Sequence, residues 1–272
     1  MSWLKDPEVL ARVQNLALPF NRDGVDPFGV SKKNIGQWLS LLSWFYRNYF
    51  DVSVKGLSHV PNTGRAMLVG NHSGGVALDA AMVLAACFLE MNPPRLGHAM
   101  AEKFLAEVPF VGTWLRRTGQ VTGLPEHALQ LLRAERLLLV FPEGARGTAK
   151  LYPERNSLVQ FGTGFVRLAI QAKAPIVPFG FLGGGDAVPT VANLYKIGKW
   201  FGLPYLPVTP YVVPLPRPVA LDVFFGEPLF FEGTGDEEDV VIQGYVDQVK
   251  ERISNLIEDG QKIRNGRDLS SK

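Results

Sequence analysis

Short apolar runs alternate with amphipathic stretches between residues 51 and 225. The apolar runs predict strands over Val52–Leu57, Arg65–Gly70, Arg95–Met100, Gly119–Thr122, Leu137–Phe141, Ile176–Phe181 and Val219–Phe225. Strands that alternate with helices form βαβ units, in which neighbouring strands run parallel and helices cover both faces of the sheet. The pattern therefore predicts an α/β fold with a mostly parallel central sheet flanked by helices.

The stretches between these strands carry apolar residues at helical spacing. They predict helices over Val76–Glu90, Glu102–Arg117, Glu126–Glu135 and Glu237–Glu258, and one more marked by apolar residues from Leu158 to Ala172. Pro109 and Gly112 are expected to interrupt the second of these helices. Gly260 is expected to end the last helix, and the polar residues 261–272 are expected to fray.

Residues 1–50 precede the alternating pattern and form a different kind of segment. A helix is expected over Ile35–Phe50, with aromatic and aliphatic residues on one side and a narrow polar stripe on the other. Such a helix can pack on the domain core, or it can lie in a membrane interface with its aromatic side down. We predict two parts: residues 1–50 as an N-terminal amphipathic helical extension that can seat on a membrane, and residues 51–272 as the α/β domain.

Residues 186–217, termed the excursion below, break the strand–helix rhythm. Prolines recur there among aromatic residues such as Trp200 and Tyr205, and Lys196 and Lys199 lie nearby. One interpretation is a structured surface segment that packs on the core. The other is an element that touches a membrane or covers an acyl chain.

Composition narrows the class of protein. The chain has 272 residues, of which 46% are hydrophobic, so it can bury a sizeable core. A net charge of +2 argues against a nucleic-acid binder with a large basic surface, and it leaves room for a local basic patch that faces anionic lipid. The single cysteine, Cys87, allows no disulfide framework within one chain, which fits a reducing compartment.

We expect no ordinary membrane span and no secretory leader. The first residues are polar and acidic, and no run of about 20 uncharged apolar residues occurs. We also expect no metal site, because no cluster of His, Cys and Asp residues has ligand spacing.

The candidate chemistry begins where the strand Arg65–Gly70 ends. His72 follows this strand, and Asp79 lies in the first turn of the next helix, where the helix dipole favours a carboxylate. A neutral imidazole can take a proton from an alcohol, and a carboxylate can hold the other ring nitrogen and stabilise the imidazolium. The other histidines have no comparable partner, and we interpret them as structural.

Two further loops follow other predicted strands. Glu143 and Arg146 come after the strand Leu137–Phe141, and a glycine triplet at residues 183–185 comes after Ile176–Phe181. Because the carboxyl ends of parallel strands share one edge of a sheet, we expect these loops to lie beside His72. The glycines can bring backbone N–H groups close to a ligand, or they can be ordinary turn residues.

Four motifs in order resemble those of the glycerolipid acyltransferases, typified by 1-acylglycerol-3-phosphate acyltransferase (PlsC-type). The first is Asn71-His72 followed by Asp79, and the third is Phe141-Pro142-Glu143-Gly144-Ala145-Arg146-Gly147. The second and fourth are Glu102-Lys103-Phe104-Leu105 with Val108–Gly112, and Ala174-Pro175-Ile176-Val177-Pro178. Together the motifs span roughly residues 50–185 of the chain.

The resemblance implies a role for each matching residue. His72 would be the general base and Asp79 its orienting partner. Glu143 would contact the acceptor's glycerol hydroxyls, and Gly144 would let the backbone approach the substrate. Arg146 and Lys103 would bind the acceptor's phosphate, a task that suits the planar guanidinium fork of arginine.

Two departures from the family pattern bear on the acceptor. Six residues separate His72 from Asp79, where the family usually has four, and the wider gap resembles the monoacylglycerol and diacylglycerol branches. The second motif usually ends in an arginine, whereas Val121-Thr122-Gly123 offers none. Both departures keep a neutral acceptor such as monoacylglycerol open beside a lysophosphatidic acid-like one.

The sequence therefore predicts an O-acyltransferase that moves a fatty acyl group to a glycerolipid hydroxyl by His72 general-base catalysis. It needs no cofactor beyond its co-substrate, an acyl-CoA or acyl-acyl-carrier-protein thioester. Its expected partners are that donor, a lipid acceptor and a membrane surface, with no nucleic acid. Its expected location is the cytoplasmic face of a membrane, peripheral or monotopic. The rival interpretations are a non-catalytic lipid-binding protein on the same scaffold and a hydrolase.

Overall fold

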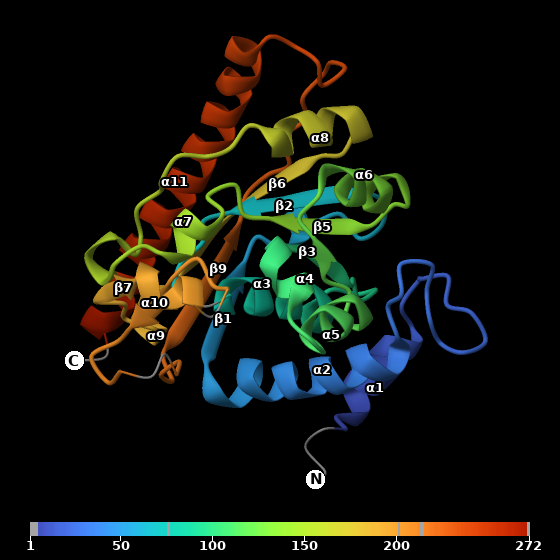
Figure 1. Cartoon of the computed structure of the whole chain (residues 1–272), viewed down its shortest axis with the longest axis horizontal. Helices are drawn as coiled ribbons and strands as arrows, with labels where there is room; N and C mark the ends of the chain where they lie inside the picture. The colour runs from blue at the N-terminus through green and yellow to red at the C-terminus, as the bar shows by residue number, and fades with distance from the viewer. Residues whose placement is uncertain (1–4, 75–76, 201, 213–214, 271–272) are drawn as a thin grey trace.

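A seven-stranded sheet forms the centre of the molecule in the computed structural model, which describes residues 5–74, 77–200, 202–212 and 215–270 (Figure 1). Its strand order is β1 (Asp51–Lys55), β9 (Ala220–Phe225), β6 (Ile176–Leu182), β2 (Ala66–Gly70), β5 (Leu137–Val140), β3 (Gly97–Ala101) and β4 (Val121–Thr122). Every neighbouring pair is parallel except β6 and β9, which pair antiparallel. The predicted α/β fold with a mostly parallel sheet is confirmed.

The central strands are apolar along their whole length because both faces of the sheet are covered. In β2, Ala66 and Leu68 belong to the core on one face, and Met67 and Val69 belong to the core on the other. Successive strand residues point to opposite faces, so burial of both faces requires a continuous apolar run instead of alternation.

Helices cover both faces of the sheet. On one face, α3 (Leu78–Glu90) packs against the strands, and α2 (Lys32–Trp44) and α1 (Pro7–Gln14) follow outside it. On the other face lie α6 (Pro125–Arg133), α8 (Gly164–Ala172) and α11 (Asp239–Ser270). Figure 1 shows α11 running along the sheet on the side away from α2.

The N-terminal segment packs on the core. Ile35, Leu39 and Leu42 of α2 are buried, which agrees with the core interpretation of this helix. The polar stripe faces α1: Ser43 Oγ donates to Asp6 Oδ2 at 3.0 Å, and Arg47 forms an ion pair with Glu8. The helix then continues as a π-helical turn, η2 (Phe45–Tyr49).

The excursion is folded and contains a pair of strands that its sequence pattern did not predict. The helical turn α9 (Gly184–Ala187) leads into it, and an antiparallel pair follows, β7 (Ala192–Leu194) and β8 (Leu206–Val208). A short helix, α10 (Tyr195–Trp200), connects the two strands.

Several predicted boundaries are wrong for local reasons. The helix α11 does not end at Gly260 but continues to Ser270, so most of the residues that were expected to fray are helical. Gly260 packs closely against Phe224, whose ring would lie 2.6 Å from an added Cβ, so this glycine serves packing and not helix termination. In the helical stretch Glu102–Arg117, the expected interruption at Pro109 is confirmed, since this residue lies between α4 (Lys103–Glu107) and α5 (Val111–Arg117), whereas Gly112 lies within α5 and does not interrupt it. The helix marked from Leu158 begins only at Gly164.

The remaining elements are short. They are two 3-10 turns, η3 (Leu57–His59) and η4 (Tyr152–Glu154), and one helical turn, α7 (Ala145–Thr148). The predicted helix start at Val76 lies outside the described residues, and α3 begins at Leu78. Among the described residues, no helix combines the length and apolar character needed to cross a membrane.

Candidate active site

The carboxyl ends of β2, β5 and β6 meet at one edge of the sheet. Leu68 is in register with Leu139 of β5 and with Val177 of β6, and both pairs of strands are parallel. The loops after these strands therefore lie together, as the sequence predicts. Asn71 links two of these loops through its side-chain amide. Its Nδ2 donates to the carbonyl oxygen of Phe181 at 2.9 Å, and its Oδ1 accepts from the backbone N–H of Phe181 at 2.7 Å.

His72 and Asp79 form a hydrogen-bonded pair at this edge. Nδ1 of His72 lies 2.6 Å from Oδ2 of Asp79. An ionised carboxylate only accepts hydrogen bonds, so the shared proton resides on Nδ1, and Nε2 of the neutral ring keeps its lone pair. Within the described residues Nε2 has no hydrogen-bond partner, so it is available as a base.

Asp79 is a fixed and fully buried partner for the imidazole. Besides His72, it accepts hydrogen bonds from the backbone N–H groups of Ser73 and Ala80, each at 2.8 Å. Its place in the first turn of α3 adds the favourable field of the helix N-terminus. On the other side, the His72 ring stacks on Phe141, with centroids 4.0 Å apart and planes 11° apart. The imidazole is thus held by an acceptor and by an aromatic plane.

The remaining histidines contact backbone carbonyl groups instead of carboxylates. Nδ1 of His59, His98 and His127 lies 3.0, 2.7 and 3.1 Å from the carbonyl oxygens of Phe225, Gly119 and Thr122. These contacts give them structural roles in the sheet and its loops. His72 is the one that combines a carboxylate partner with a position at the strand edge.

Glu143 supports His72 from the neighbouring loop. Its Oε1 accepts a 2.8 Å hydrogen bond from the backbone N–H of His72, and its Oε2 accepts one from the N–H of Val159 at 3.0 Å. Nζ of Lys150 lies 3.2 and 3.0 Å from the two oxygens, and both side chains are buried. The resemblance assigns Glu143 to the acceptor's hydroxyls, whereas in the structure its oxygens hold the chain around His72.

Lys150 is a residue of the site that the motifs did not predict. Its Nζ also donates to the carbonyl oxygen of Ser157 at 2.8 Å, so the loop that follows α7 folds back over the ammonium. A buried lysine needs a paired carboxylate, and Glu143 supplies it. The only signal in the sequence is a lysine seven residues after the motif glutamate, and that spacing does not reveal burial.

Gly147 allows the third motif to approach the histidine closely. A Cβ atom at this position would lie 2.6 Å from His72 Cβ and 2.8 Å from Glu143 Cβ, closer than real side chains come. Glycine is therefore required where α7 packs on His72 and Glu143. A similar contact joins the glycine triplet to the first motif, because a Cβ at Gly184 would lie 2.6 Å from Ser73 Oγ.

A large apolar cavity of about 920 Å³ opens beside His72. Its walls come from α2, α3, β3, α4, α5 and the part of the excursion at residues 203–207. Figure 1 shows α3, α4 and α5 grouped on the same side of the sheet as α2. Most of the wall is aliphatic or aromatic, with Trp38, Leu84 and Trp114 among its members. Cavities of this size and character accommodate lipid-like or drug-sized ligands.

The predicted substrate-binding residues divide into two groups. Lys103, at the start of α4, and Gly144, in the loop before α7, line the cavity with His72. Arg146 and Glu143 are not part of the cavity wall. Arg146 is exposed, and within the described residues its one hydrogen bond reaches the carbonyl oxygen of Gln160 at 3.4 Å. The structure thus brings the candidate base His72 and one cation, Lys103, to the cavity.

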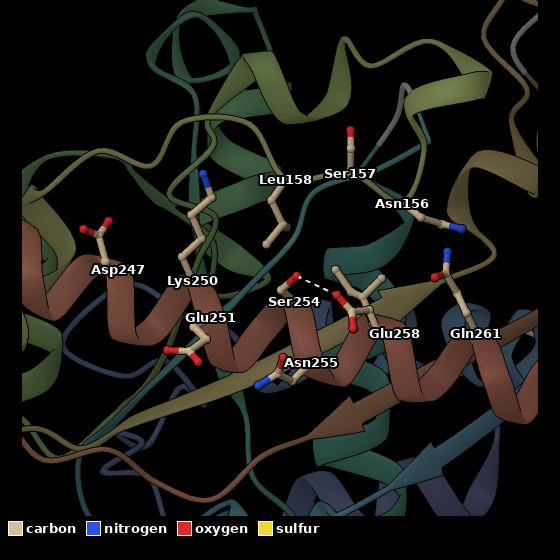
Figure 2. A pocket seen from close by; sticks show the side chains of 11 residues that line it. Asn156, Ser157, Leu158, Asp247, Lys250, Glu251, Ser254, Asn255, Glu258 and Gln261 are labelled. Atoms are coloured by element: carbon tan, nitrogen blue, oxygen red, sulfur yellow. Dashed lines mark hydrogen bonds between the residues drawn. The ribbon is translucent and has the colours of Figure 1, made fainter.

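A second hollow of about 620 Å³ lies along α11, between this helix and residues 156–158. Figure 2 shows its polar side chains and the 3.5 Å contact between Ser254 Oγ and Glu258 Oε1. Its walls mix cations, carboxylates and amides and include no histidine, so it offers no counterpart of the His72–Asp79 pair. No group of three or more His, Cys, Asp or Glu residues is placed to hold a metal ion in the described part of the chain.

Comparisons with known proteins agree with this geometry. The acyltransferase family model matches residues 51–182, which hold all four motifs. An uncharacterized protein of Mycobacterium tuberculosis is 33% identical over 245 residues, covering 86% of this chain and 68% of the relative. A human protein described as a DGAT1/2-independent enzyme synthesizing storage lipids is 22% identical over 214 residues, covering 77% of this chain and 62% of that protein.

A solved structure shares the fold. The crystal structure of the 1-acyl-sn-glycerophosphate acyltransferase from Thermotoga maritima superposes with a TM-score of 0.58. The match covers 93% of this chain and 87% of that chain, at 17% sequence identity. The arrangement of strands and helices is therefore common to both proteins.

Proposed function

Since the chain belongs to the PlsC-type glycerolipid acyltransferase family, we propose that it moves a fatty acyl group from a thioester donor to a hydroxyl of a glycerolipid acceptor. The observation that carries this proposal is the His72–Asp79 pair, with its 2.6 Å contact, at the wall of an apolar cavity. The donor is an acyl-CoA or an acyl-acyl-carrier protein.

The proposed reaction uses Nε2 of His72 as general base and then as general acid. Nε2 accepts the hydroxyl proton of the acceptor while the acceptor oxygen bonds to the thioester carbonyl carbon. The tetrahedral intermediate collapses by breaking the C–S bond, and the departing sulfur takes the proton from Nε2. The products are an ester and a free thiol, and the imidazole returns to its neutral form.

Asp79 makes His72 suitable for both steps. It fixes the tautomer that leaves Nε2 unprotonated before the reaction, and it stabilises the imidazolium that forms after proton transfer. Because its carboxylate is fully buried and bonded to two backbone N–H groups, this orientation is maintained without a cost at the moment of reaction.

The cavity suits the acyl chain of a substrate. Its aliphatic and aromatic walls remove a hydrocarbon chain from water, which is favourable by roughly 0.8 kcal/mol for each buried CH₂. A chain seated there lies against the same wall as His72. This supports a fatty acyl substrate over a small polar one.

The character of the acceptor follows from the few charges at the cavity. Lys103 and Glu102 are the only Lys, Arg, Asp or Glu residues among the described residues that line it. A phosphorylated acceptor would therefore meet one cation there, with Arg146 outside the wall. This observation favours a second candidate, a neutral acceptor such as monoacylglycerol. The description of the human relative, which names storage lipids, points in the same direction.

The decisive experiment is thiol release from acyl-CoA and from acyl-acyl-carrier protein. Each donor is tested with lysophosphatidic acid, with monoacylglycerol and without acceptor. Acceptor-dependent release supports transfer, and acceptor-independent release supports the hydrolase alternative. No release with either donor supports a lipid-binding protein. In parallel, a labelled acyl group on each donor shows whether the acceptor lipid has been converted to its ester.

A matched pair of variants tests the base. His72→Ala is expected to lower the rate by about 10²–10⁴-fold, the usual contribution of a general base. His127→Ala, which removes a histidine bound to a backbone carbonyl, is expected to keep the wild-type rate. Turnover by His72→Ala at the rate of His127→Ala would refute the mechanism.

The location of the proposed enzyme follows from its substrates. Because the acceptor and the acyl chain are lipids, the proposal includes peripheral or monotopic attachment at the cytoplasmic face of a membrane.

A further inference from the structure

Exposed apolar side chains are concentrated in the excursion. Among the described residues, 17 large apolar side chains are exposed, and eight of these lie between residues 186 and 217. The indole of Trp200, at the end of α10, is 91% exposed, and Val212 and Leu215 are also mostly exposed. Exposed apolar residues gathered on one segment mark an interaction surface more often than scattered ones do.

The same segment has one sign of charge. Between Asp186 and Asp222 the sequence contains Lys196, Lys199 and Arg217 and no carboxylate. Both lysines lie on α10 and are exposed, next to Ile197 and Trp200. Cations beside an exposed indole fit an anionic lipid surface, where the lysines meet phosphate groups and the ring enters the interface.

The excursion is also part of the catalytic cavity. Residues 203–207, which follow α10 directly, line it together with His72. Residues of α4 and α5 form another part of the wall. The loop between these two helices carries Phe110, which is 91% exposed. Trp200 in the excursion and Phe110 in the loop between α4 and α5 thus both lie on segments next to the cavity wall.

Close packing joins α10 to the cavity wall. A Cβ atom at Gly198 would lie 2.5 Å from Tyr205 Cα, so the glycine allows the helix to rest on the backbone of Tyr205. Tyr205 is buried in the wall, and the ring of Tyr195 from α10 lies 6.2 Å from its ring. A membrane that binds α10 would therefore lie close to the cavity wall that α10 packs on.

The end of the N-terminal segment meets the same region. Tyr49 Oη donates to the carbonyl oxygen of Pro216 at 2.7 Å, and its ring contacts the exposed Trp44. The buried part of α2 faces the core, and η2, which follows it, reaches the excursion. The helix Ile35–Phe50 and the excursion, the two segments for which the sequence allows membrane contact, thus meet at Tyr49 and Pro216.

From these observations we infer that the excursion, with α10 at its centre and with Phe110 in the loop between α4 and α5 as a further contact, is a docking surface for an anionic lipid bilayer. Docking there places the cavity against the leaflet, so that lipid substrates enter it from the bilayer without crossing water. This inference rests on the proposed function, because it treats the cavity as the place where lipids react.

The test is binding of the full-length chain to vesicles of phosphatidylcholine, alone or mixed with phosphatidylglycerol, measured by flotation. We expect binding to the mixed vesicles. Lys196→Glu/Lys199→Glu is expected to weaken it by roughly 30-fold or more, since each lysine near an anionic surface contributes about 1 kcal/mol. Ile197→Ser/Trp200→Ser is expected to weaken it by at least about tenfold.

Two substitutions serve as matched controls. Phe230→Ser removes an aromatic residue that is 75% exposed but follows Leu229, which pairs with Ile176 at the opposite end of β6. Arg252→Glu reverses an exposed charge on α11, on the other face of the sheet. Both controls are expected to bind vesicles like the wild type.

Vesicle binding is measured without turnover, so its outcome is separate from that of the proposed reaction. Absence of wild-type binding to the mixed vesicles would overturn the inference, and so would equal losses in the α10 and control variants. If turnover is observed, the α10 variants are expected to lose activity on vesicle-borne acceptor and to retain it on a water-soluble short-chain acceptor. Equal losses on both acceptors would also overturn the inference.

Discussion

The backbone N–H of His72 donates a 2.8 Å hydrogen bond to the carboxylate of Glu143, which comes from the loop after a different strand. This contact joins the first and third motifs across two parallel strands. The carboxylate is in turn neutralised by the buried ammonium of Lys150. The position of the candidate base therefore depends on a buried ion pair that does not touch its imidazole.

Removing one partner of this ion pair is expected to destabilise the fold. Lys150→Met leaves Glu143 as a buried, unpaired carboxylate, and such changes cost about 3–5 kcal/mol. The measurement is the free energy of unfolding from a denaturant titration. Glu143→Gln leaves the ammonium unpaired and is expected to cost a similar amount.

The double variant Glu143→Gln/Lys150→Met provides the control. It removes both charges, and the amide oxygen introduced at position 143 can still accept the hydrogen bond from the backbone N–H of His72. We expect it to regain most of the lost unfolding free energy. Losses that simply add in the double variant would show that the two side chains are not coupled.

Asp79→Asn is expected to lower turnover by roughly 10²-fold or more while the fold is retained. An amide N–H group that faces Nδ1 favours the tautomer protonated at Nε2, which cannot act as a base. Thiol release measures the effect. Asp259→Asn, on the exposed surface of α11, is the matched control, and a common rate for both variants would contradict the pairing.

Gly147→Ala tests the close approach at the base. The added methyl group would lie 2.6 Å from His72 Cβ, so the histidine or α7 must move. Because a shift of about 1 Å can cost 10²-fold in rate, we expect a fall in kcat of roughly tenfold or more.

Gly244→Ala is the contrasting substitution for Gly147→Ala. Gly244 lies in α11, and an added Cβ there meets no atom within 4 Å. It is expected to stabilise the protein by roughly 0.5–1 kcal/mol and to leave kcat unchanged. Full activity in Gly147→Ala would show that the catalytic loop tolerates the methyl group.

His98 is expected to make stability depend on pH. Burial lowers the pKa of His98 from its ordinary value of 6.5 to about 4, so between these values the unfolded chain binds a proton that the folded chain does not. Its contribution is therefore present above pH 6.5 and is lost as the pH falls towards 4, by up to about 3 kcal/mol.

The control for this pH effect is His98→Gln, because the glutamine side chain does not titrate. Its amide N–H can still donate to the carbonyl oxygen of Gly119. We expect its unfolding free energy to fall less between pH 6.5 and 4 than that of the wild type. Identical pH profiles for the two proteins would rule out a contribution from His98.

Filling the cavity is expected to discriminate between acyl chains. Ala81 of α3 lines the wall, and Ala81→Phe places an aromatic ring in the space assigned to the hydrocarbon. We expect turnover of a palmitoyl thioester to fall by roughly tenfold or more and turnover of a butyryl thioester to change little. Equal losses for the two donors would place the acyl chain elsewhere.

Much of the fold could be predicted because its signals are local. Leu137–Val140 is a fully apolar run since both faces of a parallel strand are buried, and that pattern needs no knowledge of the partner strands. The orientation of β9 could not be predicted in this way. It pairs antiparallel to β6 because the excursion returns the chain to the same edge, and this depends on contacts far apart in sequence.

The candidate site divides in the same manner. His72 and Asp79 are seven residues apart, and their motif is enough to suggest the pair from the sequence alone. Lys150 has no such signal, since most lysines are exposed, and its burial depends on a later loop that folds over it. The cavity could not be predicted either, because its wall combines residues from helices, strands and loops that lie far apart in the chain.

The strand order gives the chain a particular order of assembly during synthesis. β1 is the first strand to leave the ribosome, yet its neighbour in the sheet is β9, so that Asp51 pairs with Ala220. The stretch matched by the family model, residues 51–182, ends before β9. An excised fragment with those limits would leave β1 unpaired. In the nascent protein β1 must wait for almost the whole domain to be translated, and meanwhile it is a natural target for chaperones.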